Sequence, residues 1–360
     1  MSEKNPYEID FEEYIRHTDA SKKDKTLAWA TAIGLQQVDG LKPSSYLYET
    51  AKRNIEGELS FDDAKNLIDS YYESRTSRTD DEDERTEEAD KVSTRIAQIL
   101  SEPSFNFSPS HLIAIHKRLF EGIFKFAGKI RDYDITKKEW VLNGDTVMYG
   151  AAFELKSALD YDFEQERAFN YKGLSNDEIV KHITFFVSRL WQIHAFGEGN
   201  TRTIAVFIIK YLRSLGYKAD NDIFAENSWY FRNALVRANY SNLQNGIQEN
   251  SVFLEMFFRN LILGEKNELK NRYTHIDYGR YEKKFGENEE SSEKKFGDNQ
   301  KTSEIILELL KENPKLSAKK LSEKIGITSR AVEKQLATLV EKGLLKREGS
   351  PKGGHWEILK

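Results

Sequence analysis

The sequence predicts a mainly α-helical protein with one small β-hairpin in its body and a compact α/β module at its C-terminal end. Apolar residues recur at helical spacing through most of the 360 residues. An Asn-Gly step between two β-prone runs, at residues 140–147, interrupts this pattern. Residues 301–360 carry 13 basic against 8 acidic side chains, whereas the preceding residues carry 41 against 51. We therefore expect two domains, of which only the basic C-terminal one favours a polyanion.

The composition excludes several classes of protein. The chain has no cysteine, which rules out disulfides, thiolate metal sites and cysteine nucleophiles. No run approaches the roughly 18 apolar residues that a membrane span requires, and the N-terminus lacks a basic segment followed by an apolar core. We expect a soluble, cytoplasmic protein without a membrane partner.

Residues 1–104 are expected to form an N-terminal helical region, and residues 105–272 a helical domain. Ser60-Phe61-Asp62-Asp63 resembles a capping box and predicts the start of a helix. The acidic run Asp80–Glu84 predicts a solvated loop or a helix start, with a docking patch as the alternative. Further helices are expected at Ser228–Tyr240 and Ser251–Leu263.

The run Trp140–Val147 predicts a tight hairpin in this helical setting. Two strands alone are marginally stable. The hairpin is therefore either a surface ribbon or an edge that pairs with an extended peptide. We call its central residues the flap: Val141, Leu142, Asn143, Gly144, Asp145 and Thr146.

The C-terminal part is expected to be a linker, residues 273–300, followed by a domain, residues 301–360. The linker is polar and contains a short duplication, which is too small to form a stacked core. The domain has three helical patterns and two strand-like runs around a glycine-rich tip: Ser303–Glu312, Ser317–Lys324, Ser329–Glu341, Leu344–Arg347 and His355–Leu359.

This order is typical of a winged helix-turn-helix domain. The third helix offers Arg330, Lys334 and the amide of Gln335 to a DNA groove, and the wing offers Lys352. Contact with DNA and a role in docking or homodimerisation both remain open.

The residues His194–Arg202 read His-Ala-Phe-Gly-Glu-Gly-Asn-Thr-Arg between two apolar helical runs. His194 is suited to act as a general base near neutral pH. Glu198 supplies a hard oxygen ligand for Mg²⁺. Gly199 and Asn200 favour a backbone that turns N–H groups toward an anion, at the start of a helix whose dipole adds positive charge. Arg202 offers a planar cation for a phosphate.

Each of these residues alone is more simply explained as structural: a core histidine, a surface acid, an ion-pair partner. Their combination at this spacing has a chance probability of roughly 10⁻⁵ in a chain of this length. The combination therefore favours phosphate chemistry.

The motif closely resembles the signature of the Fic family, His-Pro-Phe-x-(Asp/Glu)-Gly-Asn-Gly-Arg. The segment Leu119–Arg131 is similar to the family segment that precedes the flap, and the resemblance covers about residues 105–265. It implies a helical Fic fold with a β-hairpin flap, followed here by the winged helix-turn-helix. It also implies transfer of AMP from ATP to a Tyr, Thr or Ser hydroxyl of a target protein, with Mg²⁺ as cofactor.

By matching positions, the resemblance makes His194 the base and Glu198 the metal ligand. The flap would present the target. The resemblance implies this set of nucleotide-binding and phosphate-binding residues: Gly197, Gly199, Asn200, Thr201, Arg202 and, near the adenine, Tyr230 and Asn233.

The chain departs from the family pattern at several positions. Ala195 and Thr201 replace proline and glycine and leave every chemical role filled. Ala205 stands where many members carry a second arginine that grips the γ-phosphate. Either another cation binds the nucleotide here, or the nucleotide or the reaction differs.

The run Ile55-Glu56-Gly57 resembles the end of the family's inhibitory helix motif, with Lys52 in place of Ser or Thr. The resemblance implies that Glu56 inhibits the enzyme or supports removal of AMP; the alternative is an ordinary exposed acid. Transfer of another phosphate-containing group, and a nucleotide-sensing DNA-binding regulator, are the other functions that we consider.

Overall fold

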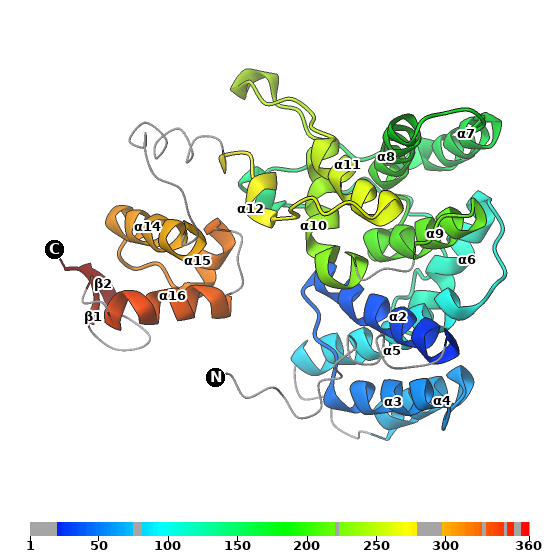
Figure 1. The fold of residues 1–360 in the computed structure, drawn as a ribbon, viewed down its shortest axis with the longest axis horizontal. Helices are drawn as coiled ribbons and strands as arrows, with labels where there is room; N and C mark the ends of the chain where they lie inside the picture. The colour runs from blue at the N-terminus through cyan, green and yellow to red at the C-terminus, as the bar shows by residue number, and fades with distance from the viewer. Residues whose placement is uncertain are drawn as a thin grey trace. The chain divides into compact units, whose positions relative to one another are not determined.

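The computed structural model describes residues 20–74, 81–219, 223–278, 297–325, 329–341, 344–348 and 354–359. The chain divides into two compact units, one of residues Met1–Lys137 and Val147–Leu269, the other of Lys138–Thr146 and Lys270–Lys360. Both units are mainly helical, and the described residues contain a single two-stranded sheet (Figure 1). The mainly α fold class is confirmed. In the described parts of the chain, we find no helix with the length and apolar character that a membrane span needs.

The N-terminal part of the first unit is a group of helices packed around α5, which contacts α2, α4, α6 and α9. Its elements are α2 (Ala20–Gly34), η1 (Leu35–Asp39), α3 (Ser45–Glu56), α4 (Phe61–Glu73) and α5 (Asp81–Ser101). The capping box is confirmed at the start of α4, where the Ser60 hydroxyl accepts a hydrogen bond from the Asp63 N–H and the Asp63 carboxylate accepts one from the Ser60 N–H.

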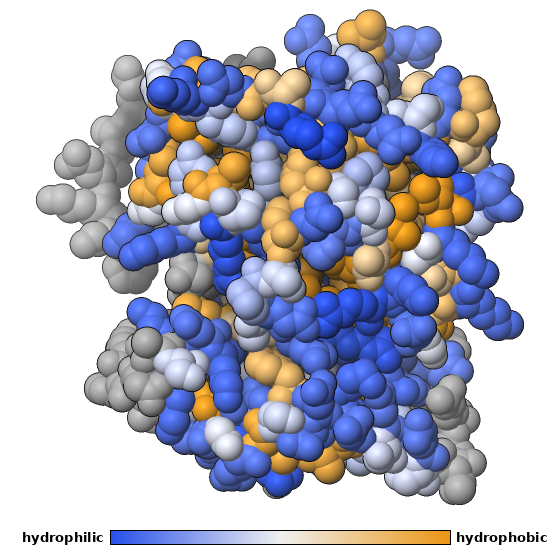
Figure 2. All heavy atoms as spheres, turned by 90° about the vertical axis from the view of Figure 1, so that its right-hand side faces the viewer, coloured by the Kyte–Doolittle hydropathy of each residue, from blue (hydrophilic) through white to orange (hydrophobic). Residues whose placement is uncertain are grey.

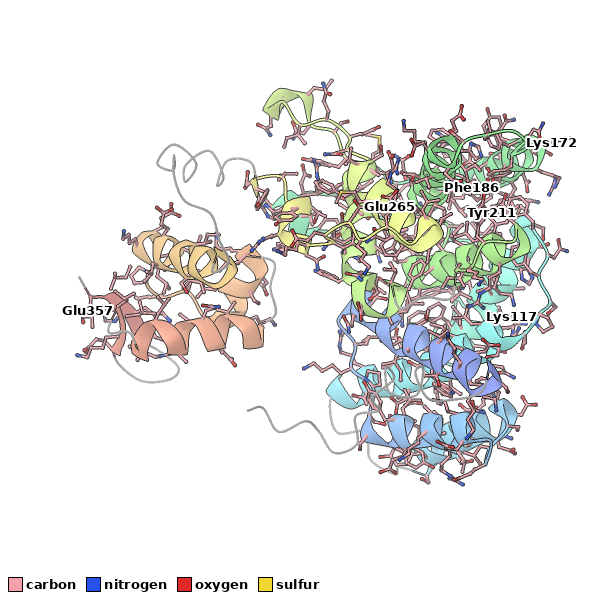
Figure 3. The ribbon with its side chains drawn as sticks, in the orientation of Figure 1. Lys117, Lys172, Phe186, Tyr211, Glu265 and Glu357 are labelled. Atoms are coloured by element: carbon pink, nitrogen blue, oxygen red, sulfur yellow. The ribbon has the colours of Figure 1, made fainter. Side chains whose placement is uncertain are left out.

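The rest of the first unit places the motif loop between two buried helices. Its elements are α6 (Pro109–Phe120), η3 (Ala152–Glu154), α7 (Leu155–Ala168), α8 (Asn176–Ile193), α9 (Asn200–Ser214), α10 (Ile223–Ala238), η4 (Leu243–Asn245), α11 (Val252–Phe258) and η5 (Arg259–Leu263). Every residue of α9 from Asn200 to Leu212 is buried. Phe186 of α8 and Tyr211 of α9 lie close together, with ring centroids 5.9 Å apart (Figure 3). The apolar runs on both sides of the motif thus form rigid walls.

Some large apolar side chains reach the surface of the first unit. Figure 2 shows apolar patches among hydrophilic side chains on one face of the molecule. The most exposed are Phe153 and Met148. Both lie in the segment before α7, which is tied to the end of α8 because the Gly150 N–H donates to the Gln192 carbonyl.

The second unit contains a winged helix-turn-helix domain with its own core. Its elements are η2 (Trp140–Leu142), α12 (Asn271–Thr274), α14 (Gly297–Glu312), α15 (Ala318–Ile325), α16 (Ser329–Glu341), β1 (Leu345–Glu348) and β2 (His355–Ile358). The two strands pair antiparallel, with Leu345 opposite Ile358. Buried apolar residues from α14, α15, α16 and β1 form one cluster. The turn at residues 326–328 and the wing tip at 349–353, including Lys352, lie outside the described residues.

The flap differs from the expected hairpin. Residues 140–142 form a 3₁₀ turn, and no strand is assigned between residues 140 and 147. Asn143 follows in the left-handed conformation, with φ of 57°. The consecutive side chains of Val141 and Leu142 are both buried, whereas a strand would point them to opposite faces. The Asn-Gly step therefore closes a turn without two paired strands.

Candidate active site

The motif loop connects α8 to α9 through two left-handed residues. His194 ends α8 with φ of 51°, and Gly199 precedes α9 with φ of 77°. A Cβ atom at Gly199 would lie 2.4 Å from the Phe120 ring, so this position requires glycine. The left-handed backbone of His194 is unusual for a residue with a side chain, and such conformations cluster at functional sites.

The amide of Asn200 holds the loop closed. Its Oδ1 accepts a hydrogen bond from the Phe196 N–H at 2.9 Å, and its Nδ2 donates to the Phe196 carbonyl at 2.6 Å. The Thr201 hydroxyl accepts a bond from the Trp191 indole. Gly197 is buried next to the Tyr133 hydroxyl. The side chains of Asn200 and Thr201 thus shape the loop, and only their backbone N–H groups are available to an anion.

These N–H groups lie in the first turn of α9. In any α-helix the first N–H groups have no partner within the helix. In the described part of the chain, no acceptor contacts the N–H groups of Asn200, Thr201 and Arg202. Together with the positive end of the helix dipole, they form a surface suited to phosphate oxygens.

His116 of α6 supports the loop from outside the motif. Its Nδ1 accepts a hydrogen bond from the Gly128 N–H, so its Nε2 carries the proton and donates to the Glu198 carbonyl at 3.0 Å. Its ring stacks on Phe196 with centroids 3.8 Å apart. Burial lowers the pKa of His116 to about 4. We did not predict this residue, because the sequence shows only one more histidine in a helical run.

Arg131 fixes the backbone around His194. Its guanidinium donates to the carbonyls of His194, Tyr133 and Gly150, and its N–H donates to the Ala195 carbonyl at 2.9 Å. The sequence marks Arg131 as the end of a family-like segment but gives it no role. In the structure its hydrogen bond to the His194 carbonyl stabilises the left-handed backbone conformation of His194.

The His194 imidazole is buried and neutral. Its residue is 3% exposed, and neither ring nitrogen has a hydrogen-bond partner among the described residues. The ring lies 4.2 Å from the Tyr149 ring. Burial lowers the His194 pKa well below its usual value, and the charge of Lys137 lowers it further. An unpaired buried nitrogen is unfavourable, so this ring is prepared to accept a hydrogen bond from a hydroxyl.

Glu198 is the exposed acid of the loop. Its side chain is 53% exposed, and its Oε2 contacts the Lys137 ammonium at 2.7 Å. The described residues contain no group of three side chains that could hold a metal ion by themselves. Mg²⁺ often takes one carboxylate and completes its octahedron with phosphate oxygens and water. The single carboxylate of Glu198 fits that mode of binding.

Arg202 has protein partners where the sequence predicts a phosphate. Its Nε contacts the Asp39 carboxylate at 2.8 Å, its Nη2 donates to Glu88 at 2.6 Å and its Nη1 donates to Gln36 at 3.0 Å. Its guanidinium also lies over the Phe120 ring. Phosphate binding by this side chain would require the two ion pairs to open. Ala205, one turn further along α9, is fully buried.

The remaining predicted residues of the first unit lie as follows. Tyr230 and Asn233 are buried in α10, and the Tyr230 hydroxyl donates to the Phe253 carbonyl. Glu56 is the last residue of α3, and its carboxylate pairs with Lys22 at 2.8 Å. The carboxylates that pair with Arg202 are those of Asp39 and Glu88, and not that of Glu56. The adenine and inhibitory roles stay predictions.

The predicted DNA-binding residues belong to the second unit. Arg330 and Lys334 lie in α16, and Gln335 of the same helix accepts a hydrogen bond from the Ser303 hydroxyl at 2.8 Å. This bond ties Gln335 to α14, so its amide is less suited to a DNA groove than we expected. Contact of Arg330 and Lys334 with DNA stays a prediction.

Comparisons with known proteins match both units. A model of the Fic/DOC family matches residues 106–212, and a model of winged helix-turn-helix DNA-binding domains matches residues 300–346. The chain is 31% identical over 119 residues to the protein adenylyltransferase VbhT of Bartonella schoenbuchensis, a match that covers 33% of this chain and 24% of that protein. It is 28% identical over 121 residues to a probable protein adenylyltransferase Fic of Salmonella typhimurium, covering 33% of this chain and 56% of that protein.

The chain therefore spans less than two thirds of either relative. Among solved structures, it resembles the N-terminal FIC domain of the Bep8 protein from Bartonella sp. 1-1C with 22% identity and a TM-score of 0.37, covering 48% of this chain and 81% of that one.

Proposed function

Because the chain carries a Fic domain followed by a winged helix-turn-helix domain, we propose that it is a protein adenylyltransferase. It transfers AMP from ATP to a Tyr, Thr or Ser hydroxyl of another protein. The hydroxyl oxygen forms a bond to the α-phosphorus, the bond from that phosphorus to the bridging oxygen breaks, and pyrophosphate leaves. The observation that carries this proposal is the buried, neutral His194 ring beside a helix start whose first N–H groups have no acceptor among the described residues.

His194 takes the proton of the attacking hydroxyl. Its lowered pKa keeps the ring neutral at neutral pH, which is the form that accepts a proton. A positioned base of this kind contributes roughly 10²- to 10⁴-fold to a rate. Arg131 and His116 position the two ends of the loop through the carbonyls of His194 and Glu198.

The N–H groups of Asn200, Thr201 and Arg202 bind phosphate oxygens at the positive end of α9. When Mg²⁺ is bound, it neutralises charge on the phosphates and on the departing pyrophosphate, and Glu198 is the residue that would hold it. Phosphate transfer of this type depends mainly on positioning and on charge neutralisation, and both are functions that the loop is suited to perform.

The test incubates the purified chain with a cell lysate and ATP labelled at the α-phosphate. Label on protein with wild type but not with His194→Ala supports the proposal; absence of label with wild type and with Glu56→Ala contradicts it. Stronger labelling by Glu56→Ala would support inhibition by Glu56, and equal labelling would make Glu56 an ordinary acid. Parallel reactions with α-labelled UTP test transfer of a different group.

A second function, DNA binding, is favoured by the apolar core and the antiparallel strand pair of the C-terminal domain. In this function Arg330 and Lys334 of α16 contact DNA phosphates. Each such contact contributes about −0.9 to the slope of log affinity against log salt. Titration of duplex DNA at several salt concentrations should give a shallower slope for the Arg330→Ala, Lys334→Ala double variant. An unchanged slope would exclude these residues as DNA contacts.

A further inference from the structure

A nucleotide bound beside His194 needs a side chain that neutralises its phosphates. Ala205 supplies no charge, and the guanidinium of Arg202 is held by Asp39 and Glu88. Arg202 is 2% exposed, and its third polar partner is Gln36. A buried cation between two carboxylates leaves them only at a high cost. Arg202 is therefore a structural link between the loop and the N-terminal helices.

Arg131 is not available to neutralise the phosphates either. Its guanidinium donates to four backbone carbonyls, and its side chain is 1% exposed. These bonds hold the corner at His194. Moving Arg131 toward a ligand would release the backbone that positions the proposed base.

Lys137 differs from both arginines in its partner and in its exposure. Its ammonium contacts Glu198 of the motif loop at 2.7 Å, and its side chain is 25% exposed. The partner carboxylate is half exposed, and ion pairs that water can reach contribute little to stability. The Lys137 ammonium can thus exchange this partner for another anion at low cost. Its charge also lowers the pKa of His194, which places it within electrostatic range of the ring.

We propose that Lys137 is the residue that binds the nucleotide phosphates in this site, in place of an arginine of the motif. The proposal rests on the adenylyltransferase function above and deepens it. It assigns a specificity-determining role: the lysine recognises the polyphosphate and does not recognise the adenosine part. Its flexible stem carries a point charge with three donors, which suits phosphate oxygens.

The pair with Glu198 gives Lys137 a defined resting position. In the absence of nucleotide the lysine neutralises the carboxylate that would hold Mg²⁺. Loss of the lysine therefore has two opposite effects: it weakens contact with phosphate and exposes the carboxylate to the metal. A binding experiment separates them when it is done both with MgCl₂ and with EDTA.

The experiment measures binding of α,β-methylene-ATP, which cannot transfer AMP, by calorimetry. In EDTA we expect Lys137→Met to bind it roughly tenfold to a hundredfold more weakly than wild type, the range expected for a lost hydrogen bond to a charged group. Lys137→Arg should recover most of the affinity. Lys138→Met is the matched control, since Lys138 is the exposed neighbour and its loss changes net charge equally.

Adenosine provides the control for the fold of the site, because it has no phosphate. Equal adenosine affinity in wild type and Lys137→Met, with weaker nucleotide binding in the variant, supports the proposal. Equal nucleotide affinity in both proteins overturns it while the adenylyltransferase function stands. Equal loss of adenosine and nucleotide binding also overturns it. So does a loss seen with Arg232→Met but not with Lys137→Met, since Arg232 of α10 is a second cation whose charge lowers the pKa of His194. Failure of wild type to bind the nucleotide with MgCl₂ overturns both proposals.

Discussion

Removal of the Arg202 guanidinium should destabilise the first unit far more than removal of a surface arginine. Arg202→Met leaves the carboxylates of Asp39 and Glu88 without their cation. Breaking a buried pair costs about 3–5 kcal/mol. Because the side chains of Asp39 and Glu88 are 33% and 18% exposed, water screens them in part and the lower limit of about 3 kcal/mol applies. At about 2–4 °C per kcal/mol, the melting temperature should fall by about 6–12 °C.

The matched control is Arg118→Met. Arg118 forms a two-armed pair with Glu102, at 2.6 and 2.7 Å, but both side chains are substantially exposed. Its loss should cost about 1 kcal/mol or less. The assay follows helical circular dichroism on heating and in urea. If both variants lower the melting temperature equally, Arg202 is not a buried structural link, and it competes with Lys137 as the phosphate-binding residue.

Three further predictions concern the loop. The acidic limb of kcat/KM for AMP transfer should have its midpoint below pH 6.5, because the base must be neutral and burial lowers the His194 pKa; a midpoint at or above that value in a pH–rate profile would contradict this. The unfolded chain protonates His116 near 6.5 whereas the folded protein does so at about 4, so the wild type should lose stability as pH falls through this window, by about 1.4 kcal/mol per unit. The advantage of wild type over His116→Phe in urea unfolding should therefore shrink with falling pH, and an advantage that does not change would refute the assignment. Finally, Gly199→Ala should destabilise the protein by more than the roughly 1–2 kcal/mol expected from the left-handed backbone alone, because the added Cβ would clash with Phe120. Gly57→Ala is the control and should cost only that amount, since Gly57 has φ of 85° and nothing within 4 Å of an added Cβ. Equal melting temperatures for the two variants would show that the clash is absent.

Local sequence signals predicted much of the fold. The Ser60 capping box, the helix at Ser329–Glu341 and the antiparallel wing follow from residues close together in the chain, and the structure confirms each of them. The hairpin at residues 140–147 was expected from an Asn-Gly step alone. That step fixes a turn but not the pairing of the residues beside it, and the burial of both Val141 and Leu142 required a different backbone.

The motif predicts a site in this loop, but it does not show which protein groups its side chains contact. The chemistry of Arg202 suggests a phosphate ligand, yet its partners Asp39 and Glu88 come from segments more than a hundred residues away, and no local pattern connects them. The support from His116 likewise depends on the packing of α6 against the loop. The role of Asn200 could not be predicted either. From the sequence its amide is equally suited to bind a ligand or to hold the loop, and only the structure shows its two hydrogen bonds to the Phe196 backbone.

In the proposed reaction, His194 serves as the base for transfer of AMP from ATP to a protein hydroxyl. The most direct measurement compares protein labelling from ATP labelled at the α-phosphate with labelling from ATP labelled at the γ-phosphate, for wild type and for His194→Ala. We predict label from the α position only, and only with the wild type. Label from the γ position, or equal α label with His194→Ala, would contradict this role of His194.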